Sequence, residues 1–186
     1  DKDGRFALRL YCIHTADKIG QCLGKGRASI LFSATFLPVR YYMELLAGKE
    51  EDYAVYAKST FEPSKKKVLL GLDVSTRYTR RTPAEYEKIA SYIRQVTEAK
   101  PGNYLVFFPS YKMMTDVEAY FLELKDSDTE IIEQSTHMTE TQREEFLGHF
   151  KEQTPGTLVG FCVMGGIFGE GIDLKKDRLI GAIVVG

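Results

Sequence analysis

The chain has 186 residues, 44% of them hydrophobic and 12% aromatic, which is enough to bury one good core but not two full domains. Its formal charge of −1 excludes a uniformly basic nucleic-acid-binding protein, yet residues 1–100 carry 18 Lys and Arg against 12 Asp and Glu, and residues 101–186 carry 7 against 14. Any contact with nucleic acid is therefore expected to be local.

The cysteines and apolar runs exclude further classes of protein. Cys12, Cys22 and Cys162 fit neither a paired metal motif nor an even disulfide framework, so we interpret them as reduced core thiols. No apolar run reaches the roughly 18 residues of a membrane span and no secretory signal opens the chain, which predicts a cytoplasmic protein without membrane contact. The absence of an initial Met and an end inside the apolar run LIGAIVVG predict a piece of a longer protein.

The first part of the chain is expected to form a small segment of its own. Its apolar runs predict strands at residues 5–13 and 28–34. A helix is expected from Pro38 to Gly48, with Tyr41, Leu45 and Leu46 on one face. After Gly48, two polar stretches bracket a short expected strand at residues 53–57. We therefore place a domain boundary at Gly48, between residues 1–48 and 49–186.

Apolar and amphipathic runs then alternate, which is typical of an α/β protein with a parallel sheet covered by helices. The expected strands are 68–74, 103–108, 129–134, 157–163 and 179–185. The expected helices are 83–99, 111–124 and 139–152. Pro83 suits the first position of a helix, and Thr139 with Gln142 forms a capping-box pattern.

The strongest functional signal is VGFCVMGGIFGEGIDL, in which a buried strand enters a glycine-rich loop. The loop holds Gly165, Gly166, Gly169 and Gly171 together with the carboxylates Glu170 and Asp173. Glycines let a backbone approach a ligand, and ligands of α/β sheets lie at strand ends. A dinucleotide-binding loop would open into a helix with its acid about 20 residues later, so we do not favour one. A glycine-rich connection without a ligand stays open as the alternative.

Two other strand ends carry small polar residues. In ILFSATFLP, the hydroxyls of Ser33 and Thr35 can connect the nucleotide side and the polymer side of a cleft by hydrogen bonds. The pattern S-x-T before a helix is also a common N-cap. In NYLVFFPSYKMM, Ser110 and Tyr111 lie at the start of an expected helix. Free N–H groups, a hydroxyl and the helix dipole together form a phosphate-binding site there.

A basic cluster, STRYTRR, precedes the helix at Pro83. Arg77 and Arg81 beside Tyr78 suit a single strand, because Arg pairs with phosphate and Tyr stacks on a base. A solvated turn is the alternative. The three histidines show no ligand spacing, so we assign them no chemistry.

Taken in order, these segments resemble one family, the XPD/DinG-like superfamily 2 DNA helicases, especially the bacterial members similar to the eukaryotic repair helicase. SATFLP resembles motif III, FFPSY motif IV, QREEFLGHF the helix that follows it, and GGIFGEGIDL motif V. The resemblance extends from about Phe6 to Gly186. Phe36 stands where the family usually has Leu, and Gly169 where it usually has Ser.

The resemblance implies a motor of two RecA-like domains that closes on ATP and steps along single-stranded DNA. It makes residues 1–48 the end of the first motor domain, with its terminal strands, and residues 49–186 a RecA-like second domain with helices on both faces of its sheet. The Mg²⁺-binding and phosphate-binding elements, and any iron–sulfur cysteines, belong to the missing first domain, since no G-x-x-x-x-G-K-[ST] occurs here. The chain alone is therefore expected not to hydrolyse ATP.

The resemblance also implies roles for particular residues. Asp173, Gly171 and Gly166 would bind the nucleotide, with Glu170 and Asp173 as the catalytic carboxylates. The coupling residues would be Ser33, Ala34 and Thr35. The residues expected from it to contact DNA are Ser110, Tyr111 and Gly165, and the basic cluster adds Arg77, Tyr78 and Arg81.

We interpret the chain as half of an ATP-dependent DNA helicase acting in repair or replication, whose partners are ATP, single-stranded DNA and the missing first motor domain. Two other functions stay open. One is a RecA-like nucleic-acid-binding or partner-docking module without ATP turnover. The other is a nucleotide-dependent small-molecule enzyme, for which Glu170 is the one plausible base.

Overall fold

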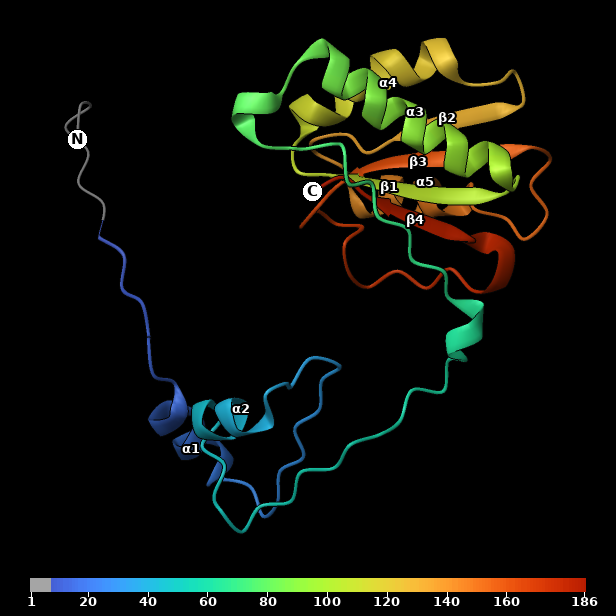
Figure 1. The fold of residues 1–186 in the computed structure, drawn as a ribbon. Coiled ribbons are helices and arrows are strands. Elements are labelled where there is room, and N and C mark those ends of the chain that lie inside the picture. Colours follow the sequence, from blue (N-terminus) through green and yellow to red (C-terminus); the bar gives the residue numbers. More distant parts are fainter. Residues whose placement is uncertain (1–7) are drawn as a thin grey trace. The chain divides into compact units, whose positions relative to one another are not determined.

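The computed structural model describes residues 8–186, so residues 5–7 of the first expected strand lie outside it. The chain divides into two compact units between Lys67 and Val68. Each unit is described by itself (Figure 1).

The first unit contains two short helices, α1 (Ala16–Leu23) and α2 (Val39–Leu45), and a 3₁₀ turn, η1 (Pro63–Lys65). Helix α2 begins directly after Pro38, as predicted. The Thr15 hydroxyl donates to the Leu45 carbonyl at 2.7 Å. A Cβ on Gly20 would lie 3.2 Å from that of Ala47, so the absence of a side chain lets the end of α2 approach α1.

The strands expected in the first unit are not formed, which corrects the prediction of terminal strands from a first motor domain. Residues 8–13, 28–34 and 53–57 contain no strand, and Ile30 and Phe32 are 88% and 89% exposed. A strand exists only when another strand pairs with its backbone, and none does so between residues 8 and 67. Cys12 and Cys22 are also exposed rather than core thiols.

The second unit is built on a four-stranded sheet, as expected for an α/β protein. Its strands are β1 (Asn103–Phe108), β2 (Thr129–Glu133), β3 (Thr157–Val163) and β4 (Gly181–Val184). Their order is β2-β3-β1-β4, and every pair is parallel. The strand predicted over residues 68–74 is absent: this segment forms no ladder, and Leu70 and Leu72 are 78% and 89% exposed.

Helix α3 (Pro83–Ala99) leads into β1, α4 (Tyr111–Leu124) connects β1 to β2, and α5 (Glu140–Gly148) connects β2 to β3. Two 3₁₀ turns, η2 (Tyr78–Arg80) and η3 (Lys176–Arg178), precede α3 and β4. The capping box of Thr139 and Gln142 is confirmed. Helix α5 ends at Gly148, earlier than predicted, and Phe150 beyond its end is 1% exposed.

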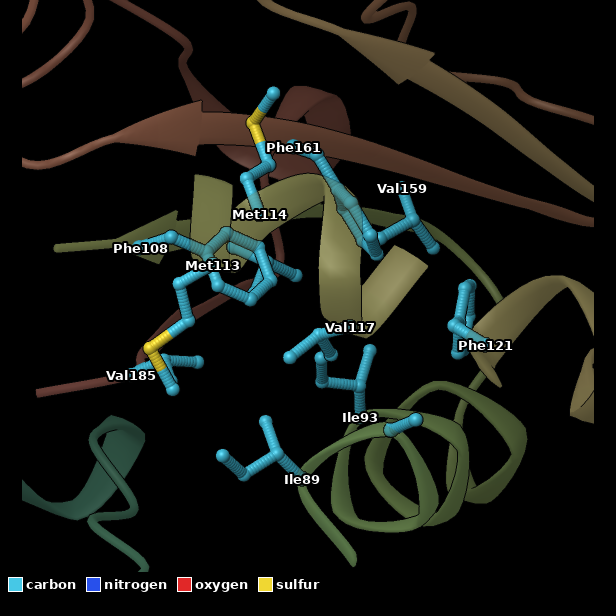
Figure 2. Close-up of a cluster of buried hydrophobic side chains, with 12 residues drawn as sticks. Ile89, Ile93, Phe108, Met113, Met114, Val117, Phe121, Val159, Phe161 and Val185 are labelled. Carbon is cyan, nitrogen blue, oxygen red and sulfur yellow. The ribbon is translucent and has the colours of Figure 1, made fainter. Parts of the chain in front are cut away.

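The core has two layers, one on each face of the sheet. Helices α3 and α4 pack on one face, where Phe108 and Phe161 meet Met113, Val117 and other apolar side chains (Figure 2). Helix α5 lies on the other face with Phe146 and Phe150 (Figure 1). Successive side chains of a strand point to opposite faces, so β1 and β3 supply both layers and read as continuous apolar runs.

Two neighbouring strands send their connections to opposite faces of the sheet. The chain leaves β1 into α4, which packs with α3. It leaves β3 into a loop whose Phe168, Ile172 and Leu174 pack on the α5 face. Such a divergence opens a crevice outside the carboxyl ends of the strands, where ligands of open α/β sheets bind. Both the FFPSY and the GGIFGEG segments lie at this edge.

Candidate functional site

Gln134 joins the two motif segments at the carboxyl edge of the sheet. It directly follows β2 and is 4% exposed. Its side-chain Nε2 donates to the Tyr111 hydroxyl at 2.9 Å. Its Oε1 accepts from the Val163 backbone N–H at 3.0 Å. One amide side chain therefore connects the start of α4, after β1, with the end of β3.

The sequence reasoning did not single out Gln134. The available signal was a polar residue at the end of the expected strand TEIIEQ, at the same edge of the sheet as Ser110 and Gly165. The Tyr111 hydroxyl in turn donates to the Ser135 carbonyl at 3.2 Å. The Ser110 hydroxyl accepts from the Met113 backbone N–H at 3.3 Å, so Ser110 caps α4 at the predicted helix start.

The two glycines after β3 differ in what they permit. A Cβ on Gly166 would lie 2.9 Å from both the Gln134 Nε2 and the Val163 carbonyl oxygen, so only glycine lets the loop pass beside Gln134. Gly165 has φ of +70°, and a Cβ there would meet nothing within 4 Å. Its backbone is open to a ligand, whereas Gly166 is needed for packing.

The glycine-rich loop is held by one aromatic anchor and one arginine. Phe168 is fully buried, with its ring centroid 4.3 Å from that of Phe146. From α5, the Arg143 side chain donates to the Ile167 carbonyl at 3.3 Å and to the Gly171 carbonyl at 2.9 Å. Arg143 was also missed in the sequence, because its partners are backbone carbonyls that no side-chain pattern reveals.

The two carboxylates of the loop face solvent. Ile172 and Leu174 pack on the core, and the alternation leaves Asp173 between them on the outside. Its carboxylate lies 3.1 Å from the Lys175 ammonium, and both side chains are about three-quarters exposed (75% and 76%). Glu170 is exposed as well. Both carboxylates are accessible to a ligand that approaches the loop.

The structure gives the arginines of the STRYTRR cluster different partners. Arg80 forms an ion pair of 3.2 Å with Glu85, whose side chain is buried. Arg81 lies over the Tyr78 ring, its guanidinium carbon 5.8 Å from the ring centroid. Arg77 is exposed. Arg80 is thus structural, and Arg81 with Tyr78 remains available to a ligand.

The predicted coupling segment Ser33, Ala34 and Thr35 lies in the first unit and is exposed. The Ser33 hydroxyl accepts from the Thr35 backbone N–H at 3.1 Å and lies 3.1 Å from the Thr35 hydroxyl. These local bonds are the turn-forming bonds that Ser and Thr often make.

Among residues 8–186, no three His, Cys, Asp or Glu side chains are grouped so that they could hold a metal ion. Within the same residues, no helix is both long enough and apolar enough to span a membrane.

Comparison with known proteins agrees with this geometry. Residues 93–186, half of the chain, match the helicase C-terminal domain family. The chain is also 24% identical over 200 aligned positions to the ATP-dependent DNA helicase CHL1 of Scheffersomyces stipitis, and the match covers 99% of this chain. It covers 24% of that relative, so the chain spans about a quarter of its length. On these matches and on the two motif segments that meet at Gln134, the chain belongs to the XPD/DinG-like superfamily 2 helicases, in which it contains the helicase C-terminal domain.

Proposed function

We propose that this chain is the second motor half of an ATP-dependent DNA helicase, which couples ATP hydrolysis to movement along single-stranded DNA and to duplex unwinding in repair or replication. Residues 1–48 would be the end of the first motor domain and residues 49–186 the second. ATP, Mg²⁺ and the remainder of the first domain would complete the reaction site, in the cytoplasm.

The observation that carries this proposal is the connection made by Gln134. A motor must link the surface that holds DNA to the surface that senses nucleotide. In the second unit, the start of α4 offers Ser110 and a helix N-terminus, a combination that suits a phosphate of the DNA backbone. The glycine-rich loop offers Glu170 and Asp173 to the nucleotide side. Gln134 contacts Tyr111 at 2.9 Å and Val163 at 3.0 Å, so movement of one segment is transmitted to the other.

The proposed roles follow from exposure and position. Gly165, with an open backbone, and Ser110 would contact DNA, together with Tyr111, Arg77, Tyr78 and Arg81. Asp173 and Gly171 would approach the ATP ribose and phosphates when the two motor domains close, and Gly166 keeps the loop against Gln134. Arg143 is the positioning residue, since it holds the carbonyls on both sides of Gly169.

ATP hydrolysis by the complete protein that contains this segment tests the proposal. We expect hydrolysis to rise on addition of single-stranded DNA, and a duplex with a single-stranded tail to be unwound only with ATP. The isolated chain should show no turnover, because phosphoryl transfer depends on positioned Mg²⁺ and phosphate-binding groups. It should still bind single-stranded DNA weakly, with an affinity that falls steeply as salt rises.

A complete protein that binds single-stranded DNA yet never hydrolyses ATP would instead be a RecA-like binding module. Turnover by the isolated chain above a denatured control would contradict the assignment of the nucleotide-binding elements to the other domain. Equal affinity of the isolated chain for single-stranded DNA at low and high salt would contradict the phosphate contacts.

A further inference from the structure

A groove on the outer surface of the second unit carries a second set of aromatic and basic groups. It lies between η2, the start of α3 and the exposed side of α4, with a volume of about 810 Å³. Three tyrosines, Tyr78, Tyr86 and Tyr120, line it together with Arg81 and Lys112. Of the segments at the sheet edge, only the first turn of α4 lines this groove, and the glycine-rich loop does not.

The hollow of the groove follows from the spacing of small residues on α4. Positions 112, 115, 116 and 119 recur at helical spacing and share one side of the helix. Two of them are the small residues Thr115 and Ala119, which leave space between Lys112 and Tyr120. The floor is rigid, because Met113 is 1% exposed and both Tyr86 and Tyr120 pack on the core.

The electrostatics of the groove leave one positive charge free for a ligand. Asp116 lies 3.0 Å from the Lys112 ammonium. Burial, followed by the neighbouring Asp116 carboxylate, raises the pKa of Tyr86, so that hydroxyl stays neutral. Arg81 uses its Nε to donate to the Thr76 carbonyl at 3.0 Å. Its guanidinium forms no ion pair among residues 8–186.

The Tyr78 ring is presented for stacking. It is 86% exposed, although burial of a large aromatic side chain usually stabilises a protein. Arg81 lies on it at 5.8 Å, which orients the ring beside a cation. An exposed aromatic ring, an unpaired guanidinium and half-buried tyrosines together form the pattern that binds bases and phosphates of a single strand.

We propose that this groove is a base-stacking site for single-stranded nucleic acid, separate from the sheet edge and continuous with it through α4. Ser110 and Tyr111 belong to the edge, and Lys112, the next residue, lines the groove. A strand held by phosphate contacts at the edge continues into the groove, where Tyr78 stacks on a base and Arg81 pairs with a phosphate. This proposal rests on the proposed function, because it assumes a nucleic-acid strand at the edge.

The test measures fluorescence anisotropy of a labelled oligothymidylate and of an abasic oligomer with the same length and charge, both with the 186-residue chain. Stacking predicts tighter binding of the oligothymidylate. Tyr78→Ala should weaken that binding by about five- to 150-fold and leave the abasic oligomer unaffected. Ala119→Leu, which fills the groove without removing a contact, should also abolish the difference between the two ligands.

Matched controls separate the groove from general effects. Arg81→Ala should lower the salt dependence of binding by about one phosphate contact, whereas Arg94→Ala removes the same charge from α3 and should not. Tyr53→Ala removes another tyrosine, which is 97% exposed in the first unit, and should leave binding unchanged. Circular dichroism of each variant verifies the fold.

The outcomes distinguish this inference from the proposed function. Equal affinity for the two oligomers, with no effect of Tyr78→Ala, contradicts the base-stacking groove and the DNA contact proposed for Tyr78. The phosphate contacts proposed for Ser110 and Gly165 at the sheet edge remain in place in that case. Failure of the wild-type chain to bind either oligomer at low salt overturns both proposals. A loss of binding in Tyr53→Ala equal to that in Tyr78→Ala also overturns the groove.

Discussion

Gln134, at the end of β2, donates its side-chain N–H to the Tyr111 hydroxyl at 2.9 Å, at the start of α4. Because the same amide also accepts from Val163, three parallel strands are joined at their carboxyl ends by one residue. A buried amide in this position satisfies groups on two segments that are each proposed to contact a ligand. Its hydrogen bonds can therefore stabilise one relative arrangement of those segments.

Gln134→Leu should destabilise the second unit by about 2 kcal/mol, since it leaves the Val163 N–H without its acceptor and removes the amide that donates to the Tyr111 hydroxyl. Chemical denaturation followed by circular dichroism measures this. Gln95→Leu is the control, because Gln95 is exposed on α3 and bonds only to Ser91 there. A Gln134→Leu protein as stable as the control would mean that the amide does not hold the edge together.

Gly166→Ala should cost about 1–3 kcal/mol through overpacking, because its Cβ would lie 2.9 Å from Gln134 and from a backbone carbonyl. Gly148→Ala is the matched substitution at the end of α5, where a Cβ meets nothing within 4 Å. There the better helix propensity of Ala should raise stability by up to about 1 kcal/mol. Equal effects of the two substitutions on the denaturation midpoint would contradict the close packing at Gly166.

Arg143→Ala should release the glycine-rich loop while leaving the sheet intact. The Gly169 backbone N–H donates to the Gly166 carbonyl at 3.0 Å, and its amide exchange with deuterium reports on the loop. We expect faster exchange there and no change in β1. Arg143→Lys should restore little of the protection of the loop amides, since an ammonium lacks the planar guanidinium that reaches two carbonyls. Arg94→Ala, which removes an ion pair on α3, should leave the loop amides protected.

Stability should fall as pH rises towards neutral because of two carboxyl groups. Burial and the nearby Glu133 carboxylate raise the pKa of Glu118 from 4.5 to about 7. The folded state therefore binds a proton that the unfolded state releases between these values, so this contribution is full below about 4.5 and lost as pH passes about 7. Glu118→Gln should flatten the dependence of the melting temperature on pH over that window. An unchanged slope in Glu118→Gln would show that the pair does not share a proton.

The sequence could predict the strands and helices of the second unit because their signals are local. Pro83 with Thr82, Ser110, and Thr139 with Gln142 mark helix starts within one turn. Strands β1 and β3 are apolar after their first residues, Asn103 and Thr157. The predictions at 28–34, 53–57 and 68–74 were wrong because a strand also needs a partner, which is not a property of its own residues. The segment at 68–74 has the apolar composition of a strand but pairs with no backbone in the described part of the chain.

The candidate site was predictable in outline for the same reason. The carboxyl ends of parallel strands lie at one edge of the sheet, so the sequence predicts that Ser110 and Gly165, which follow two such strands, lie at that edge. Gln134 and Arg143 could not be assigned, since their roles depend on which groups lie opposite them in space. Likewise, only the structure distinguishes Arg80, which pairs with a buried carboxylate, from Arg81.

Asp173→Asn in the complete enzyme should reduce ATP turnover severely and leave the fold unchanged. By our proposal Asp173 contacts the nucleotide only when the motor closes, and Asn keeps its shape while removing its charge. Loss of one charge-assisted hydrogen bond in the reactive state corresponds to roughly 30- to 100-fold slower turnover.

The alternative role of Asp173, a carboxylate that caps the loop, predicts a lower melting temperature with normal turnover. The carboxylate is 75% exposed, and its partner within the chain is Lys175, so the melting temperature should hardly change. Lys175→Ala removes the same exposed ion pair, which contributes about 0–1 kcal/mol, and should keep normal turnover. Measuring turnover and melting temperature on one preparation of each variant decides the matter: a destabilised Asp173→Asn enzyme with wild-type specific activity would assign the residue to the loop rather than to the nucleotide.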